Sequence, residues 1–593
     1  MKSLTPATLS LIWVGSIFLS ACSSVDTTET DVAQNTSAQS LHAQLSQQNK
    51  PMQSEQRQSE QQPSEQQPSD QQQLKPVSAP TKQSHEMKQR VSMMSHSVIA
   101  KRHSATDYMP YAEEENRENY NHFNDSDILK ASNDPVSTFS VDVDTGSYSN
   151  VRRFLNQGNL PRRDAVRAEE LINYFSYQYE YPQQKKQPFT INTEIAPTPW
   201  NQHSYLLHIG LQAYQSHNNE QRPANNLVFL VDVSGSMHSR DKLQLLKSGL
   251  MLLVNNLNEN DRISIVTYAG ATGVILKPTP GNQTAEISMA LDQLTAGGST
   301  NGAGGIELAY KMAQQSFIKE GVNRIVLATD GDFNVGVTNF EELKQMVEKK
   351  RRTGISLTTL GFGRGNYNDH LMEQLADAGN GNYSYIDNLN EARKVLVEEM
   401  HSTLNSVAND VKIQVEFNPD QVSEYRLIGY ENRALKQQDF NNDKVDAGDI
   451  GENHIVTALY EITFTDSAVK QFDADRYAKK TMLNKNNELN EELAFLRLRY
   501  KADSNAKSQL LKKPIYRNEI IKNLAHSSNN FKFSASVAAF AQQLRGGKYL
   551  HEFSYNDILV LAKKSQGKDE FGYRGEFIQL VSLAKALAKA LDT

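Results

Sequence analysis

The chain has 593 residues, too many for one hydrophobic core, and this length indicates two to four domains. Hydrophobic residues make up 38% of the chain and charged residues 22%, which is typical of a soluble globular protein. The formal net charge is only -7, so no basic field marks the chain as a nucleic-acid-binding protein.

The first residues have the features of a signal peptide. Lys2 precedes an apolar run over residues 9–19, which is short for a transmembrane helix and right for the hydrophobic region of a signal peptide. The run ends in Leu19-Ser20-Ala21-Cys22, which resembles the lipobox of bacterial lipoproteins, where the cysteine becomes the lipidated first residue. The alternative is an ordinary signal peptide with a chance cysteine. Cys22 is the single cysteine, so no disulfide forms within the chain.

We therefore expect residues 1–21 to be removed and Cys22 to anchor the protein in the bacterial cell envelope. By the same resemblance, Ser23 in place of an aspartate favours the outer membrane. Residues 22–133 follow as a flexible tether, because Gln, Ser and Pro dominate residues 44–82 and almost no large apolar side chain is present to bury. Such a coil of about 110 residues spans roughly 60 Å. The last stretch contains aromatic residues and is the part able to dock onto a folded body.

Residues 134–222 are expected to form a small α+β domain. Residues 138–143 alternate apolar and polar side chains like a half-buried strand. Residues 168–175 have apolar side chains at helical spacing, and residues 189–195 and 205–214 resemble further strands.

The central part, residues 223–405, alternates strands with helices. Strands are expected at residues 227–231, 262–268, 273–276 (an edge), 324–328, 355–361 and 383–386, and helices at 243–257, 285–294, 306–315, 340–349, 369–378 and 389–404. This alternation predicts an α/β fold with a mainly parallel, doubly wound, Rossmann-like sheet. Ligands of such sheets bind outside the carboxyl ends of the strands.

Residues 406–593 are expected to form a β-rich and then helical domain. Residues 411–417 alternate apolar and polar side chains, and residues 455–464 and 495–500 repeat that style. The final helix has an apolar stripe from Phe577 to Leu591, which we interpret as core packing and not as a membrane-surface helix.

Three polar segments of the central part lie where a doubly wound sheet collects its ligands. They are Asp232-x-Ser234-x-Ser236, then Thr300 in a glycine-rich stretch before a helix, and Asp330 after the strand at 324–328. Hydroxyls and carboxylates are hard oxygen donors, which suit Mg²⁺ best, with Mn²⁺ or Ca²⁺ as alternatives, and disfavour copper or structural zinc. With few direct carboxylates, the ion stays electron-poor and should accept a carboxylate from a partner.

These residues resemble, in order and context, the metal-ion-dependent adhesion site of von Willebrand factor A domains. The resemblance implies that Ser234 and Ser236 bind the ion directly, that Thr300 binds it directly or through water, and that Asp232 and Asp330 bind it or hold its waters. Integrin and matrix members use this fold to bind acidic residues of protein partners.

The resemblance extends to the flanks. Residues 137–144, 411–417 and 425–430 are similar to an enterobacterial family of envelope lipoproteins in which dedicated N- and C-terminal regions flank this domain. That family covers nearly the whole chain past Asn133 and implies no established biochemical activity.

Four other features are candidate sites. The segment Asp142-Val-Asp-Thr-Gly-Ser147 imitates the metal motif, but Asp144 or Thr145 is better interpreted as a helix N-cap. Asp439-x-Asn441-x-Asp443 is similar to a calcium loop without the required glycine, and we expect a solvated hairpin loop. Asp332 either tunes the charge of the site or caps its loop. His238 is expected to be a surface residue.

No motif for catalysis accompanies the site. The chain lacks a G-x-S-x-G elbow and a phosphate-binding G-x-x-x-x-G-K-[ST] loop, so we expect a binding protein and not an enzyme. The main hypothesis is an envelope protein, lipid-anchored through Cys22, that binds a protein partner through a divalent ion. The alternatives are a scaffold whose flanking regions bind while the metal is ancillary, and a metal-dependent hydrolase.

Overall fold

The computed structural model describes residues 117–184, 186–215, 222–299, 302–331, 340–399, 402, 404–473, 491–503 and 506–591, all within one compact unit, Ala105–Thr593. The expected signal peptide, Cys22, most of the expected tether, Thr300 and Asp332 lie outside the described residues.

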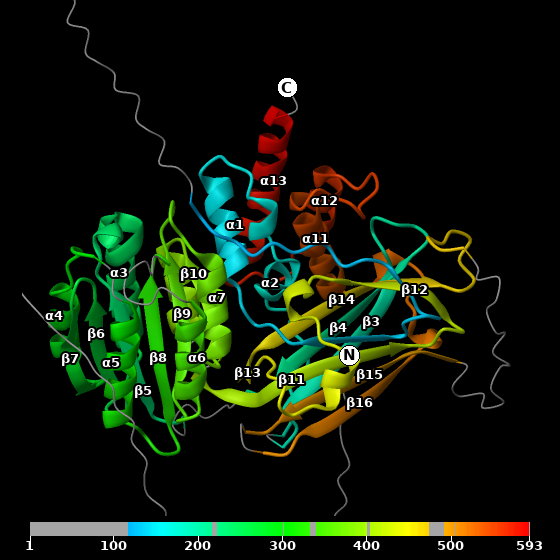
Figure 1. Cartoon of the computed structure of the whole chain (residues 1–593). Helices are drawn as coiled ribbons and strands as arrows, with labels where there is room; N and C mark the ends of the chain where they lie inside the picture. The colour runs from blue at the N-terminus through cyan, green and yellow to red at the C-terminus, as the bar shows by residue number, and fades with distance from the viewer. Residues whose placement is uncertain are drawn as a thin grey trace, which may run out of the picture. The chain divides into compact units, whose positions relative to one another are not determined.

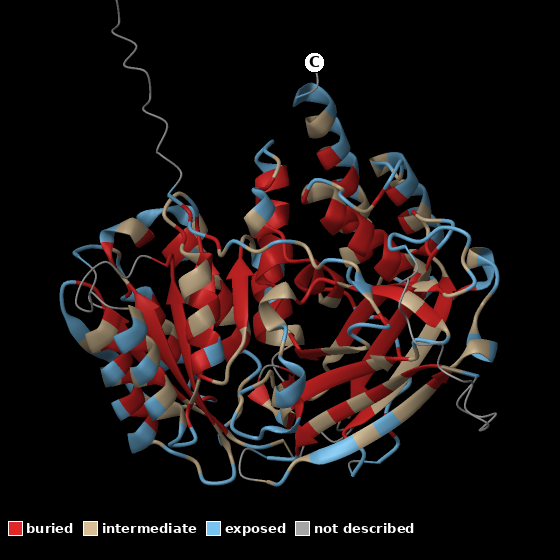
Figure 2. Ribbon diagram, turned by 45° about the vertical axis from the view of Figure 1, so that its right-hand side comes forward, coloured by how far each residue is buried: buried red, intermediate tan, exposed pale blue. Residues whose placement is uncertain are grey.

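The central domain is built on a six-stranded sheet with the strand order β10-β9-β8-β5-β6-β7 (Figure 1). Its strands are β5 (Asn225–Asp232), β6 (Arg262–Tyr268), β7 (Thr272–Pro280), β8 (Val322–Thr329), β9 (Ser356–Phe362) and β10 (Tyr383–Ile386). Only β7, at the edge, runs antiparallel to its neighbour. The inner strands are buried along nearly their whole length (Figure 2). Continuous burial explains why their sequences are runs of apolar residues and not alternating patterns.

Helices cover both faces of this sheet. The helices are α3 (Leu245–Val254), α4 (Thr284–Asp292), α5 (Gly302–Gln315), α6 (Phe340–Arg351), α7 (Asp369–Ala378) and α8 (Leu389–Arg393). Apolar side chains of α3, α4 and α8 belong to one core cluster, and those of α5, α6 and α7 to another. The expected doubly wound α/β fold is confirmed. The prediction of one helix from residue 389 to residue 404 is wrong. The α-helix α8 ends at Arg393, and a π-helical turn, Lys394–Glu398, follows it.

The rest of the described chain forms two further sheets and a helical layer. One sheet contains β1 (Leu129–Lys130), β12 (Val422–Ile428), β14 (Ile455–Phe464), β4 (Tyr205–Ala213) and β3 (Phe189–Pro197). The other contains β13 (Ile450–Gly451), β11 (Ser406–Phe417), β15 (Glu492–Lys501) and β16 (Gln509–Tyr516), with β2 (Val136–Ser140) also paired to β11. The helices are α1 (Gly146–Asn156), α2 (Ala168–Asn173), α11 (Asn529–Leu544), α12 (Tyr555–Ser565) and α13 (Tyr573–Leu591). We call these elements together the flanking body.

Alternation along β4 shows how the layers of the flanking body pack. Leu207, Ile209 and Leu211 enter the core that joins the two sheets. Leu206 faces the other way, into the core beneath the helices. A strand with both faces buried needs partners on each side, and a lone hairpin is only marginally stable in water.

The flanking body corrects the expected division into two flanking domains. Strands from residues 134–222 pair with strands from residues 406–593: β2 lies beside β11, and β4 lies beside β14. The expected tether also ends too late, because residues 117–133 belong to the folded unit. Within that stretch, β1 pairs with β12, and the Glu118 carboxylate binds Arg153 at 2.9 Å.

The stripe of α13 packs as expected. Phe577, Leu580, Val581 and Ala584 are at most 3% exposed, whereas Leu591 is 76% exposed at the end of the helix. Within the described part of the chain, every helix is too short or too polar to span a bilayer.

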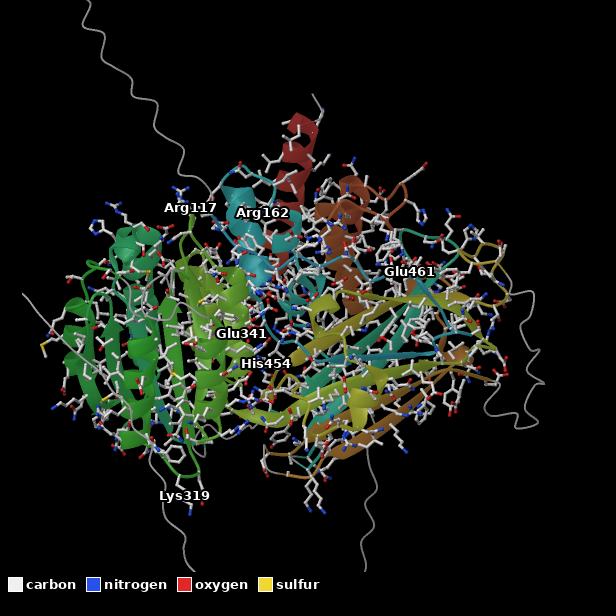
Figure 3. All side chains as sticks on the ribbon, viewed as in Figure 1. Arg117, Arg162, Lys319, Glu341, His454 and Glu461 are labelled. Carbon is white, nitrogen blue, oxygen red and sulfur yellow. The ribbon has the colours of Figure 1, made fainter. Side chains whose placement is uncertain are left out.

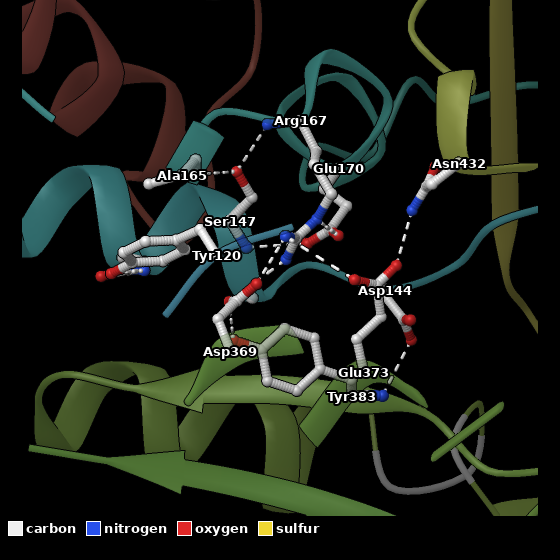
Figure 4. Close-up of polar contacts among 12 residues, drawn as sticks. Tyr120, Asp144, Ser147, Ala165, Arg167, Glu170, Asp369, Glu373, Tyr383 and Asn432 are labelled. Carbon is white, nitrogen blue, oxygen red and sulfur yellow. Dashed lines mark hydrogen bonds and ion pairs between the residues drawn. The ribbon is translucent and has the colours of Figure 1, made fainter. Parts of the chain in front are cut away.

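Buried ion pairs join the central domain to the flanking body (Figure 4). Arg167, just before α2, donates from Nη1 to Asp369 Oδ2 of α7 at 2.6 Å and also binds Glu170. The three side chains are at most 1% exposed. Tyr383 of β10 adds a hydrogen bond from its hydroxyl to Asp369 Oδ1 at 2.6 Å. Because these charges are fully desolvated, each depends on its partner.

A second arginine, with a side chain that is 12% exposed, pairs with the segment that imitates the metal motif. Arg433 pairs with Asp142 at 3.0 Å and with Asp144 at 3.1 Å. The expected N-cap is wrong, because Thr145 precedes α1 without a side-chain cap and Asp144 accepts from the backbone N–H of Tyr383 instead. In the calcium-like stretch, Gln437–Asn441 forms a 3-10 helix, and residues 441–444 are exposed, as expected of a solvated segment.

Candidate metal centre

The two carboxylates of the predicted site follow adjacent parallel strands. Asp232 is the last residue of β5, and Asp330 comes directly after β8, which pairs with β5. Carboxyl ends of parallel strands meet at one edge of the sheet, so the fold brings both acids there. Each side chain is buried, with 0% exposure.

The loop after β5 presents two hydroxyls beside Asp232. The backbone N–H of Ser234 donates to Asp232 Oδ1 at 2.9 Å, which turns the chain at the end of the strand. The Oγ atoms of Ser234 and Ser236 then lie 2.9 Å apart. In an octahedral shell with metal–oxygen distances of about 2.1 Å, neighbouring oxygens are about 3.0 Å apart. The two hydroxyls hydrogen-bond to each other, at a separation that adjacent ligands of one octahedral ion would also have.

Asp232 is held from its other side by a residue that the sequence did not single out. The Thr329 hydroxyl donates to Asp232 Oδ2 at 2.8 Å and accepts from the backbone N–H of Gly331 at 3.1 Å. Burial, with the nearby charge of Asp330, raises the pKa of Asp232 to about 6 despite the hydrogen bonds from Ser234. The raised pKa means that the negative charge of Asp232 is poorly stabilised by its surroundings. A bound cation would stabilise that charge.

The glycine-rich stretch before Thr300 is joined to this loop. The backbone N–H of Gly235 donates to the Gly298 carbonyl at 3.0 Å, and that of Gly297 donates to the Val233 carbonyl at 2.7 Å. Gly298 has φ +90°, a conformation that favours glycine. Thr300 itself lies outside the described residues, so its part in the site stays a prediction.

A lysine that was not predicted from the sequence also contacts the centre. Lys242 Nζ lies 2.9 Å from Asp330 Oδ2 and 3.5 Å from Asn366 Oδ1. Its side chain is 8% exposed. No periodicity or motif marked this residue, because its contact with Asp330 depends on a fold that brings the loops after β5, β8 and β9 together.

Several exposed residues lie on the loops that carry the candidate centre. Gly235, His238 and Arg240 are exposed on the loop after β5, and Arg364 is exposed on the loop after β9. The expectation of a surface histidine at His238 is confirmed. The backbone N–H of Arg117, another exposed arginine, donates to the Gly365 carbonyl at 2.7 Å, which places Arg117 at the edge where the strands end (Figure 3).

The donor set fits a hard divalent ion that is bound largely through hydroxyls. Among the described residues, no group of three or more His, Cys, Asp or Glu side chains is arranged to hold a metal. An ion at Asp232 and Asp330 would therefore depend on Ser234 and Ser236 for further oxygens. Such a shell suits a hard divalent ion and leaves further positions for water.

Comparisons with known proteins agree with this architecture. The von Willebrand factor type A domain family matches residues 226–423, a family described as von Willebrand factor matches residues 114–208, and the family of the C-terminal part of YfbK matches residues 402–587. The second match includes the ordered residues 117–133.

Individual relatives were also found. The Escherichia coli (strain K12) protein YfbK is 48% identical over 471 residues, which cover 78% of this chain and 80% of that protein. Inter-alpha-trypsin inhibitor heavy chain H3 of Mesocricetus auratus is 25% identical over 278 residues, which cover 42% of this chain but only 29% of that protein. A solved von Willebrand factor type A structure from Catenulispora acidiphila is 14% identical and covers 66% of this chain and 89% of its own, with a TM-score of 0.38.

High identity over most of both chains, together with the matched C-terminal region, decides the family. The chain belongs to the YfbK family and carries a von Willebrand factor type A domain.

Proposed function

We propose that the protein binds a protein partner through a divalent ion, Mg²⁺ before Mn²⁺ or Ca²⁺, held at Asp232, Ser234, Ser236, Thr300 and Asp330. Domains of this type commonly mediate protein–protein interaction. The observation that carries the proposal is the pair of serine hydroxyls 2.9 Å apart beside two buried carboxylates, at an open edge of the sheet.

The charges around the mouth support an acidic partner. Arg240 and Arg364 are exposed on the loops after β5 and β9, and their charges would attract a carboxylate that approaches the ion. Complementary charge of this kind speeds encounter and disfavours wrong partners. The Ser234 hydroxyl meets Ser236, and neither residue is a general base, which supports binding over hydrolysis.

We further propose that the protein is lipid-anchored through Cys22 in the outer membrane of a bacterial envelope, with the Gln-, Ser- and Pro-rich stretch as its tether. The lipobox-like Leu19-Ser20-Ala21-Cys22 supports this placement. Metabolic labelling with an alkyne fatty acid should mark the parent protein and not Cys22→Ser. An unlabelled parent protein would reject the anchor and leave the metal centre unaffected.

Site-specific photo-crosslinking in cells tests partner binding. A photo-reactive phenylalanine replaces His238 at the mouth, and in a control protein it replaces Lys319, which is exposed at the opposite edge of the sheet (Figure 3). We expect a discrete crosslinked protein only from position 238, and we expect Asp232→Ala to abolish it. Crosslinking that persists in Asp232→Ala, or that arises equally from position 319, would reject a metal-dependent partner site.

A further inference from the structure

A buried lysine stands inside the candidate metal centre. Lys242 lies in the helical segment Arg240–Gln244, but its backbone dihedrals, φ -119° and ψ -108°, are not helical. The side chain is buried, and its ammonium binds Asp330 Oδ2 at 2.9 Å. A lysine at the start of a surface helix ordinarily extends into solvent, because its charge is costly to bury.

The fold provides a channel for this side chain. Gly363, on the loop after β9, has φ +72°, and a Cβ at this position would lie 2.1 Å from the Lys242 Cε and 2.5 Å from its Cγ. The Tyr385 hydroxyl donates to the Gly363 carbonyl at 2.5 Å and fixes that peptide. A glycine held at this point leaves room for the aliphatic part of the lysine. The position of the ammonium is therefore set by three loops.

The ammonium changes the charge balance of the centre. Without a cation, Asp232 and Asp330 are two buried carboxylates close enough for each to affect the other. Lys242 balances one of them. With a divalent ion also present, these described side chains and the ion together carry one positive charge in excess, whereas the same centre without the lysine would be neutral.

We propose that Lys242 is a built-in counter-cation that competes with the divalent ion for Asp330 and makes the loaded centre selective for an anionic partner. This inference rests on the proposed function. The lysine keeps the centre folded without an ion, because Asp330 is paired in the ion-free state. It also weakens binding of the ion alone through cation–cation repulsion. The carboxylate of the partner then neutralises the one positive charge that the loaded centre has in excess.

The test measures Mn²⁺ binding by the whole protein, with free Mn²⁺ followed by electron paramagnetic resonance. Lys242→Met removes the charge and keeps the aliphatic length, Lys242→Gln is a second neutral variant with a donor for Asp330, and Lys242→Arg retains the charge. The matched control is Lys247→Met, because Lys247 Nζ contacts only the carbonyls of Asp292 and Leu294 among its described hydrogen bonds. Unfolding in chelator gives a second readout for each protein.

We expect either neutral variant to bind Mn²⁺ at least ~10-fold more tightly than the parent and to be less stable in chelator. Lys242→Arg and Lys247→Met should bind like the parent. Equal or weaker Mn²⁺ binding by both folded neutral variants, with the parent still binding, would overturn the role of the lysine and leave the metal centre intact. Binding by a neutral variant but not by the parent would support the competition and reject the proposed function, and no binding by any variant would reject both.

Discussion

Arg167→Met tests whether the central domain and the flanking body are joined by buried charge. The guanidinium is 1% exposed and makes two hydrogen bonds to Asp369, from Nη1 at 2.6 Å and from Nη2 at 3.3 Å. Burial raises the pKa of Glu170 to about 8 and also raises that of Glu373. Asp369 is the carboxylate that accepts both of these hydrogen bonds from the guanidinium. Methionine fills most of the volume but leaves that carboxylate buried without its cation.

Removing one partner of a buried pair costs about 3–5 kcal/mol, and we expect Arg167→Met to lower the free energy of unfolding by that amount. Urea unfolding measures it, with circular dichroism for the whole fold and the fluorescence of Trp200, which is 5% exposed in the flanking body. The control is Arg497→Met, whose partner Glu416 is 43% exposed, and it should cost at most about 1 kcal/mol. A cost for Arg167→Met no larger than that of the control would refute the reasoning.

Burial lowers the pKa of His208 to about 4 from 6.5, so the neutral ring stabilises the fold fully above pH 6.5 and this contribution is lost as the pH falls toward 4. His208→Phe should therefore lose about 3 kcal/mol less stability between pH 7 and pH 4 than the parent, and equal losses would contradict the assignment. Phe577→Ala should cost about 3–5 kcal/mol in denaturant unfolding, and Leu591→Ala less than about 0.5 kcal/mol; similar costs would contradict core packing of the last helix. Gly363→Ala should cost about 2 kcal/mol or more, because a Cβ would collide with the buried lysine stem, and Gly158→Ala, at φ +77° with open space around it, should cost about 1 kcal/mol by the same assay.

The central domain could be predicted well from the sequence because its signals are local. Apolar runs mark buried parallel strands, and the predicted bounds of β6 and β10 match the structure. The predicted bounds of helix α7 match as well. The motif residues Asp232 and Asp330 end neighbouring strands, and the topology alone places them at one edge. Their role as metal ligands stays a prediction.

The features that could not be predicted depend on pairings between distant parts of the chain. Neither strand of the β3–β4 hairpin indicates that it lies beside β14, about 250 residues later. Arg167 and Asp369 are 202 residues apart, and each resembles an ordinary surface charge in the sequence. The buried position of Lys242 depends on the space left by Gly363, on a loop far along the chain.

Thermal unfolding in chelator and then with Mg²⁺, Mn²⁺ or Ca²⁺ tests the metal centre most directly. An ion that binds only the folded state stabilises it by roughly 3 kcal/mol at a hundredfold excess over the dissociation constant. Asp232→Ala is compared with Asp466→Ala, a variant of an exposed acid in the flanking body. We predict that the ion raises the melting temperature of the parent and of Asp466→Ala but not that of Asp232→Ala. An equal rise in all three proteins, or no rise in the parent, would contradict a metal centre at this edge of the sheet.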